Sequence, residues 1–367
     1  MSDVDVAVIG GGPVGLATAI RARMAGFRVR LLDRRRPPID KPCGEGLMPE
    51  GVAALGTLGV DTQELGRRFT GIRYIDGDLD ATGLFPGEAG LGIRRLKLHE
   101  MLASRAASLA VDLGWGVKVE GIDGRRVRTS TGDFTCEWIV GADGLHSSVR
   151  KWLGVPVVTR SRRFAVRRHY AVEPWSDVVE VWWGRDCEAY VTPVGDHEVG
   201  VAFLWSQAKA RFSSLLEQFP RLARRLTGAP ATSKDLGAGP LWNMPKRITV
   251  GRVALAGDAA GYLDAITGEG LSLGFRQAGL VVHAFSTGDL GWYEAAARRA
   301  RRWPFAMIRV LLYLERHPRI RRRAIRSLAE DPELFSRILS LQNGELSPMR
   351  VGIGRTGRLL LSLARGD

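Results

Sequence analysis

The sequence predicts an α/β fold: a discontinuous Rossmann-like nucleotide domain, an antiparallel-sheet substrate domain and a helical C-terminal segment. Three observations predict it. Residues 4–32 have the pattern strand, glycine-rich turn, helix and strand, residues 163–205 alternate in short strand-like stretches, and the chain is helical in pattern from about Leu271 almost to its end. An apolar strand at 250–255 leads into a second glycine-rich turn, which indicates that the nucleotide fold is interrupted and then resumed.

The composition is that of a globular protein of about two domains. The chain has 367 residues, of which 45% are hydrophobic and 25% charged, and this excludes a disordered scaffold. No run approaches the roughly 18 apolar residues of a membrane span, and the chain opens with acids, so we expect a cytoplasmic protein. The three cysteines lack C-x-x-C spacing and the six histidines lack metal-ligand spacing, which predicts no metal site.

Each element follows from a local pattern. A β-branched strand is expected at 4–9, a helix at 16–25 ended by Gly26, and an apolar strand at 27–32. Short strands separated by turns at 117–119, 127–129 and 134–140 predict a β-meander. The stretches 178–183, 189–192 and 199–205 predict the antiparallel sheet of the second domain.

The first motif is a G-x-G-x-x-G that follows a strand and opens a helix. Gly10 permits the tight turn, Gly12 lets the backbone approach a pyrophosphate, and Gly15 lets the helix pack against the strand. The helix N-terminus offers N–H groups to phosphates, and Asp33 ends the second strand where a carboxylate can bind ribose hydroxyls. The motif therefore predicts a dinucleotide site. Two neighbours complete the predicted contacts, Pro13 and Arg34.

Two later motifs indicate which dinucleotide binds. The segment 141–150, with Asp143 and Gly144, resembles the D-G-x-x-S-x-x-R signature of the FAD-dependent aromatic hydroxylase (p-hydroxybenzoate hydroxylase-like) superfamily, and 251–260 resembles its strand that ends in Gly257-Asp258. The resemblance implies FAD, with Asp258 on the ribityl chain and Asp143 near the pyrophosphate. It also implies that Arg95 lies near the cofactor, whereas a position on a solvated helix face is the alternative.

A glycine-rich helix start follows the third motif. Thr267-Gly268-Glu269-Gly270 begins a helix of small and apolar residues, whose N–H groups and dipole can face the flavin ring where negative charge accumulates on reduction. Gly268 and Gly270 permit close approach of that ring. Glu269 is a candidate catalytic acid, and the alternative is a first-turn acid favoured by the dipole.

The segment 41–46, Lys-Pro-Cys-Gly-Glu-Gly, resembles the geranylgeranyl reductase branch of the same superfamily. In that branch a C-G-x-G loop borders the flavin, which implies cofactor contacts for Cys43 and Gly44 and a substrate-facing thiol; a buried structural thiol is the alternative. The branch carries an aromatic-rich Y-x-W-x-F-P strand, of which only Tyr190 and Pro193 remain here. Loss of both bulky rings argues against a polyprenyl substrate. Cys43, Glu269 and Tyr190 are the predicted catalytic residues.

We therefore expect an FAD domain at 1–70, 92–160 and 250–295, a substrate domain at 71–91 and 161–249, and a helical segment at 296–367. The resemblance favours a monooxygenase in which NAD(P)H reduces FAD and a C4a-hydroperoxide hydroxylates an aromatic or lipophilic molecule. An FAD-dependent alkene reductase is the first alternative, and a flavin-bearing binding or maturation partner without turnover is the second. The lack of another G-x-G-x-x-G in its context predicts that NAD(P)H visits the interdomain crevice transiently.

The positive charge concentrates near the C-terminus. The net charge is +14, and residues 298–326 hold eleven arginines and the single acid Glu315, interleaved with apolar side chains. A cationic face beside an apolar stripe predicts peripheral contact with a membrane or an acidic partner, and a solvated basic helix is the alternative. Nothing matches a nucleic-acid module, so we expect no nucleic-acid partner.

Overall fold

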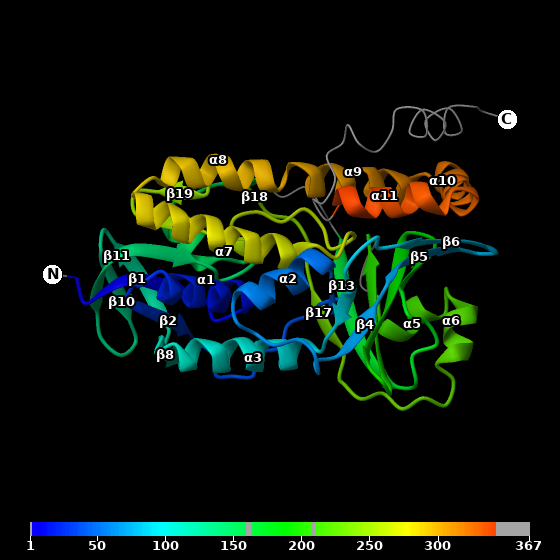
Figure 1. The fold of residues 1–367 in the computed structure, drawn as a ribbon, viewed down its shortest axis with the longest axis horizontal. Coiled ribbons are helices and arrows are strands. Elements are labelled where there is room, and N and C mark those ends of the chain that lie inside the picture. The colour runs from blue at the N-terminus through cyan, green and yellow to red at the C-terminus, as the bar shows by residue number, and fades with distance from the viewer. Residues whose placement is uncertain (1, 159–162, 207–209, 343–367) are drawn as a thin grey trace.

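Two β-sheets lie end to end in the protein and share one long layer of helices (Figure 1). The structure is a computed structural model that describes residues 2–158, 163–206 and 210–342. It confirms the α/β class and the helical C-terminal part of the described chain. Strands β1 (Val4–Ile9), β11 (Phe134–Gly141) and β20 (Val253–Leu255) join one sheet although long segments separate them in the sequence, so the nucleotide fold is interrupted and then resumed, as the sequence predicts.

The first sheet is built around strand β1 (Val4–Ile9). Strand β1 pairs in parallel with β2 (Val29–Asp33) and β11 (Phe134–Gly141), and β11 pairs in parallel with β20 (Val253–Leu255). Residues 6–8 of β1 are fully buried in the main hydrophobic core of the protein. The remaining strands are β8 (Asp112–Trp115), β9 (Val119–Asp123), β10 (Arg126–Thr129) and β19 (Thr249–Val250).

Three helices pack on this sheet and set the site's position. They are α1 (Pro13–Met24), α3 (Arg95–Ser108) and α7 (Gly270–Thr287). Helices α1 and α7 lie so close together that a Cβ at Gly274 would lie 2.4 Å from the Val14 side chain. The parallel strands β1, β11 and β20 all end at one edge, and the three glycine turns that follow them are brought together there.

The second sheet contains seven strands and carries one departure from the expected antiparallel order. Strand β14 (Val179–Trp183) pairs in parallel with β5 (Gly71–Asp76), which belongs to an earlier excursion of the chain. The parallel pairing arises because β5 and β14 are far apart in sequence and no hairpin fixes their direction. The other strands are β6 (Leu79–Leu84), β13 (Phe164–Ala171), β15 (Cys187–Gly195), β16 (Glu198–Trp205) and β17 (Leu236–Ala238).

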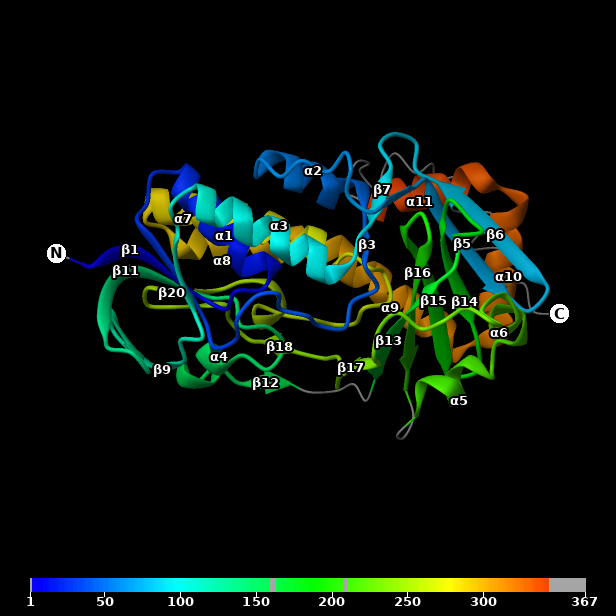
Figure 2. The same cartoon turned by 90° about the horizontal axis from the view of Figure 1, so that it is seen from below.

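Short elements connect the two sheets, and the last helices cover the second one (Figure 2). Strands β3 (Gly46–Leu47), β4 (Arg67–Phe69) and β7 (Gly90–Gly92) form a small sheet at the junction, next to helix α2 (Pro49–Thr57). Helices α8 (Leu290–Ala300), α9 (Arg302–Arg316), α10 (Pro318–Glu330) and α11 (Pro332–Gln342) follow α7, and α10 and α11 pack on β6. Among the described helices, none combines the length and the apolar character needed to cross a bilayer.

Minor elements complete the described chain: β12 (Val157–Val158), β18 (Met244–Pro245), α4 (Ser148–Trp152), α5 (Phe212–Leu216) and α6 (Pro220–Arg225). Of these, α4 matters most for the site, because it directly follows the second glycine turn. The predicted helix at 16–25 begins three residues earlier than expected, since Pro13 occupies its first turn, where no backbone N–H donor is needed.

Candidate functional site

The first glycine turn has the geometry that a phosphate-binding turn requires. Gly10 has a φ of +111°, which side chains disfavour, and a Cβ at Gly15 would lie 1.8 Å from the Gly10 carbonyl oxygen. Space around Gly12 is open, because a Cβ there would meet no atom within 4 Å. The turn therefore combines close helix–strand packing with an exposed backbone that a ligand can approach.

Asp33 lies beside that turn at the end of β2. Its Oδ2 accepts a hydrogen bond from the Gly11 N–H at 2.8 Å, and its Oδ1 accepts one from the Arg35 N–H at 2.8 Å. The buried His99 of α3 donates from Nε2 to the Gly11 carbonyl oxygen at 2.9 Å, so three segments hold the turn. Arg34, which the sequence included among the cofactor contacts, is exposed next to Asp33.

The second motif is tied to the third by a buried arginine. Asp143 Oδ2 accepts hydrogen bonds from the N–H groups of Ser148 (2.6 Å) and Val149 (3.1 Å) at the start of α4, and its buried Oδ1 has no protein partner. Arg150, the last residue of the motif, is 5% exposed and donates to the Ala259 carbonyl oxygen at 3.3 Å. The D-G-x-x-S-x-x-R pattern is therefore a spacing that lets one side chain reach the neighbouring turn.

The third turn positions Asp258 at the edge of both cavities of this region. Gly257 has a φ of +61°, and its N–H donates to Gln277 Oε1 of α7 at 2.8 Å. Asn243 Nδ2 donates to the Asp258 carbonyl oxygen at 2.7 Å. These contacts fix the turn from two sides, so the Asp258 side chain is held where it lines the cavity.

The main cavity lies between the two sheets and contains about 1530 Å³ of empty space that opens to solvent. One wall is formed by the glycine turns and the other by the second sheet. The predicted residues that line it are Gly12, Pro13, Cys43, Gly44, Arg95, Tyr190, Gly257, Asp258, Gly268 and Gly270.

The 41–46 loop crosses the middle of this cavity. Thr192 Oγ1 of β15 donates to the Gly44 carbonyl oxygen at 2.7 Å, and the Glu45 N–H donates to Cys43 Sγ at 3.4 Å. Burial raises the pKa of the Cys43 thiol, which therefore stays protonated near neutral pH. The loop therefore presents a neutral thiol to the cavity. Thr192 and Glu45, which hydrogen-bond to Gly44 and Cys43 of the loop, also line the cavity wall.

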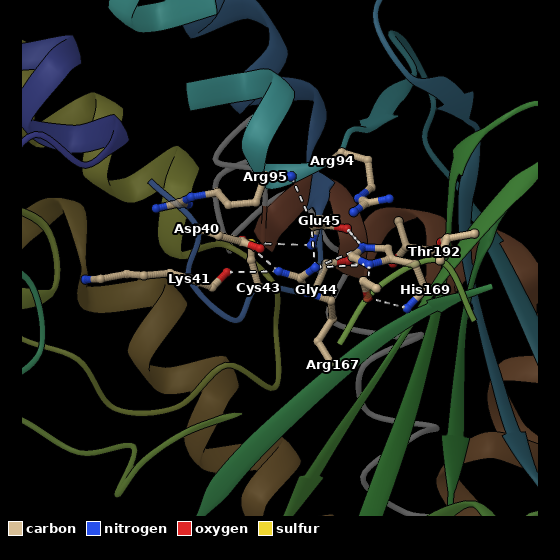
Figure 3. Close-up of polar contacts among 12 residues, drawn as sticks. Asp40, Lys41, Cys43, Gly44, Glu45, Arg94, Arg95, Arg167, His169 and Thr192 are labelled. Carbon is tan, nitrogen blue, oxygen red and sulfur yellow. Dashed lines mark hydrogen bonds and ion pairs between the residues drawn. The ribbon is translucent and has the colours of Figure 1, made fainter. Parts of the chain in front are cut away.

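A buried polar cluster anchors the same loop (Figure 3). Glu45, 3% exposed, has a φ of +60°; its Oε1 accepts from the Arg95 N–H at 2.7 Å and its Oε2 contacts His169 Nε2. Arg167, two residues before His169 on β13, donates from Nη2 to Asp40 Oδ1 at 2.8 Å. Strand β13 thus places a cation and an imidazole on the face that meets the loop.

Tyr190 and Glu269 line two different cavities. Tyr190 lines the main cavity and its hydroxyl donates to the Ile266 carbonyl oxygen at 3.1 Å; burial raises its pKa well above 10.0. Glu269 lines a second, smaller cavity against α9, where one of its carboxylate oxygens has no partner. Burial raises the Glu269 pKa to about 8. The structure brings Cys43 and Tyr190 into one cavity and leaves Glu269 behind its wall.

Sequence reasoning missed three residues: Lys41 and Arg167, which line the main cavity, and His169, which is buried behind Glu45 of the loop. Lys41 is the first residue of the 41–46 loop. Burial lowers the pKa of Lys41, which indicates that its ammonium group is held out of full solvent contact. The signal for the other two was present in β13, whose Arg167 and His169 share one face of an otherwise mostly apolar sheet.

The residues present fit a dinucleotide. The open backbone at Gly12, the Lys41 ammonium at the cavity wall and the partnerless buried atoms Asp143 Oδ1 and Arg95 Nε match phosphates and hydroxyls. The two buried side-chain atoms have no hydrogen-bond partner within the protein, and a bound ligand would supply one. The polar atoms of the cavity's nucleotide wall thus have unfilled hydrogen-bonding capacity in the right places for FAD.

Comparison with known proteins agrees with this arrangement. Residues 3–287 match the protein family described as FAD binding domain. A digeranylgeranylglycerophospholipid reductase of Methanothermobacter thermautotrophicus is 27% identical over 335 residues, covering 81% of this chain and 83% of the relative. A menaquinone reductase of Mycobacterium tuberculosis is 28% identical over 351 residues, covering 86% and 85%.

Solved structures share the fold. A flavoprotein/dehydrogenase from Cytophaga hutchinsonii superposes with a TM-score of 0.81 at 18% identity and covers 93% of each chain. At that identity the likeness concerns the arrangement of the two sheets and their helices, and it confirms the predicted fold class.

Proposed function

The chain belongs to the FAD binding domain family of oxidoreductases, and on that premise we propose that it reduces a carbon–carbon double bond in an isoprenoid lipid. Two observations support the proposal: the Cys43 loop borders the cavity, and the cavity's second-sheet wall is predominantly apolar. The names of the two reductase relatives agree with a lipid substrate. This proposal reverses the preference for hydroxylation that the superfamily resemblance alone suggested.

The apolar wall carries the argument. Ala165, Ala202 and Ala238 come from three neighbouring strands and line the cavity together, so this part of the floor consists of small apolar side chains. Leu204 and Leu241 continue the same surface. Such a wall desolvates a hydrocarbon chain at about 25 cal/mol per Å² of apolar area, whereas it offers a charged substrate no compensation. Because these alanine side chains are small, we keep a polyprenyl chain as the proposed substrate although the aromatic rings of the branch are missing.

The chain's own residues would bind the cofactor, orient the substrate and supply the proton. When bound, FAD supplies the hydride. The turn around Gly12 and the Lys41 ammonium would hold its phosphates and Asp258 would hold the ribityl chain, while Cys43 keeps a neutral thiol in the cavity lining. We include NAD(P)H as the reductant, binding transiently at the open side of the cavity. The second sheet excludes water from the reacting bond.

A second candidate is the monooxygenase of the original expectation. It is supported by three tyrosine rings in the cavity wall, Tyr74, Tyr190 and Tyr262, against which an aromatic substrate could pack. Both reactions need an apolar, water-poor cavity, so oxygen dependence separates them. A binding or maturation partner without turnover is the third reading.

The test uses FAD-loaded protein that is photoreduced without oxygen and mixed with detergent-solubilised geranylgeraniol. We expect the flavin to reoxidise and the product to gain two hydrogens, and we expect Cys43→Ala to slow this step at least tenfold with FAD affinity retained. Thr57→Ala, at a surface contact outside the cavity, is the matched control. A product formed only with O₂ and containing one added oxygen would establish the second candidate, and absence of turnover in both settings would support the third.

We also propose that α9 binds an anionic membrane surface, where a lipid substrate would be available. Its outer face exposes Trp303 (43%), Val310 (51%) and Tyr313 (51%), and Arg302 and Arg309 lie exposed beside them. The only acid of the helix points inward. An amphipathic face of this kind is suited to the interface between headgroups and acyl chains.

Vesicle sedimentation tests this surface. We expect binding to vesicles with phosphatidylglycerol, weaker binding to pure phosphatidylcholine, and loss of binding as salt screens the charges. The double change Arg302→Glu with Arg309→Glu should abolish it, whereas Arg185→Glu, at an exposed turn of the second sheet, should not. Equal binding by both variants would contradict the proposal.

A further inference from the structure

The buried contact between Glu45 and His169 continues to the protein surface. His169 is fully buried, and its Nδ1 lies 2.8 Å from Ser233 Oγ. Ser233 is partly exposed, and its neighbours Thr232 and Lys234 are exposed. A continuous line of three titratable or hydroxyl side chains therefore runs from the cavity loop through the second sheet to solvent.

The hydrogen bonds along this line have one consistent direction. Ser233 Oγ accepts the His169 backbone N–H at 3.0 Å, which leaves the hydroxyl proton free to be donated to His169 Nδ1. With Nδ1 accepting, the neutral imidazole carries its proton on Nε2, which faces Glu45 Oε2. A proton that enters at Nδ1 thus releases the Nε2 proton toward Glu45, and the ring regains its starting tautomer when the proton on Nδ1 moves to Nε2 before the next cycle.

Charged side chains surround the Glu45–His169 pair and hold it in position. Arg167 Nη1 lies 3.0 Å from His169 Nδ1 and forms an ion pair with Glu45 Oε1 at 3.8 Å, while its other nitrogen is bonded to Asp40. On the neighbouring strand β16, Glu198 pairs with Arg94, and the pKa of Glu198 is lowered because hydrogen bonds and nearby cations outweigh its burial. Arg167 therefore contacts both members of the pair and fixes their relative position.

The left-handed backbone of Glu45 supports a role beyond packing. A non-glycine residue at φ of +60° is strained and persists where surrounding contacts determine it, commonly at functional sites. Glycine occupies the positions on both sides of Glu45, and it would adopt this φ without strain. The carboxylate at this position reaches His169 and the Arg95 N–H simultaneously.

We propose that Ser233, His169 and Glu45 form a proton relay that supplies the cavity from solvent. The proposal rests on the proposed reductase function, in which each double bond gains one hydride and one proton: the hydride adds to one carbon and the proton to its neighbour. Solvent provides the proton, no further oxidant is consumed, and the relay residues end the step in their starting protonation states. Glu45 lines the cavity and releases the proton there, whereas His169 and Ser233 are positioning residues that act through Glu45 without touching the substrate.

The first experiment measures proton supply without the substrate. FAD-loaded protein is reduced anaerobically by reduced methyl viologen, which donates electrons and no proton, in H₂O and in D₂O. We expect Ser233→Ala, His169→Gln and Glu45→Gln to slow the proton-linked phase about tenfold or more and to change its pH profile and solvent isotope effect. Thr232→Val, at the adjacent exposed hydroxyl outside the relay, is the control and should behave as the parent protein.

A second readout does not depend on turnover. Nitrogen NMR of the His169 ring should show the Nε2–H tautomer in the parent protein and a shifted equilibrium in Ser233→Ala. Parent-like proton kinetics in all three relay variants, or a ring that titrates as a solvent-exposed imidazole, would overturn the relay. Failure of the parent protein to reduce geranylgeraniol, with the viologen results as expected, would instead refute the reductase function alone.

Discussion

A buried charge cluster behind the cavity wall makes the pH dependence of stability predictable. Arg163, which precedes β13, donates to Glu188 (2.8 Å), Asp264 (2.9 Å) and Glu315 (3.2 Å), and all four side chains are at most 5% exposed. The cluster joins β15, the segment before α7 and helix α9. Three carboxylates share the Arg163 cation there, so ionisation of all three is unfavourable.

Glu188 is the group whose titration we expect to dominate. Burial raises its pKa from 4.5 to about 7, with Glu315 and Asp264 adding to the rise and Arg163 opposing it. The folded protein therefore binds this proton more tightly than the unfolded chain. The resulting stabilisation is fully present below pH 4.5 and is lost as the pH rises through 7, and it amounts to about 3 kcal/mol.

The substitution Glu188→Gln tests this magnitude. The glutamine amide oxygen can still accept from Arg163 but cannot ionise, so the variant should lose about 3 kcal/mol less stability than the parent between pH 5 and pH 8. Urea unfolding followed by tryptophan fluorescence at both pH values gives the difference. Glu173→Gln, at an exposed site, is the matched control and should keep the parental slope. Equal pH slopes in the parent and Glu188→Gln would refute the reasoning.

Three further predictions follow from the geometry. Gly15→Ala should abolish FAD binding, measured by flavin absorbance of the purified protein, because the new methyl group would lie 1.8 Å from the Gly10 carbonyl oxygen; normal flavin content would contradict the assigned turn. Ala202→Trp should fill the cavity floor and lower the rate of geranylgeraniol reduction at least tenfold while FAD affinity is unchanged, and an unaltered rate would place the substrate elsewhere. Arg163→Leu should destabilise the protein by about 3–5 kcal/mol at pH 8 and by less at pH 5, measured by urea unfolding, because it leaves buried carboxylates without their cation; equal losses at both pH values would contradict the cluster's charge state.

The positions of the arginines explain why the net charge alone does not show whether they stabilise the fold or bind a partner. Within residues 298–326, Arg301 donates to the Ala260 carbonyl oxygen at 3.0 Å and Arg321 binds Asp76 at 2.8 Å, so both serve internal contacts. Arg302 and Arg309 remain on the exposed face of α9. The same residue type thus stabilises the fold and forms the surface that we propose for an anionic membrane, and only burial separates the two uses.

The sequence by itself determined the nucleotide half of the protein. The turn at Gly10–Gly15, the acid Asp33 and the Gly257-Asp258 turn are local requirements of backbone geometry and phosphate contact, so they are written in short contiguous patterns. For the same reason the two strand–turn junctions could be assigned to one interrupted domain before any contact was known. Strand direction in the second sheet was less accessible, because the parallel pairing of β5 with β14 leaves no hairpin signature.

Only the tertiary structure decided which side chains face one another across the cavity. Glu45 and His169 are 124 positions apart, and neither lies in a motif that names the other. The placement of Glu269 in a second cavity likewise depends on how α9 packs against the start of α7. Contacts of this kind follow from the packing of whole elements, which no local spacing encodes, whereas a glycine turn carries its geometric requirement within a few residues.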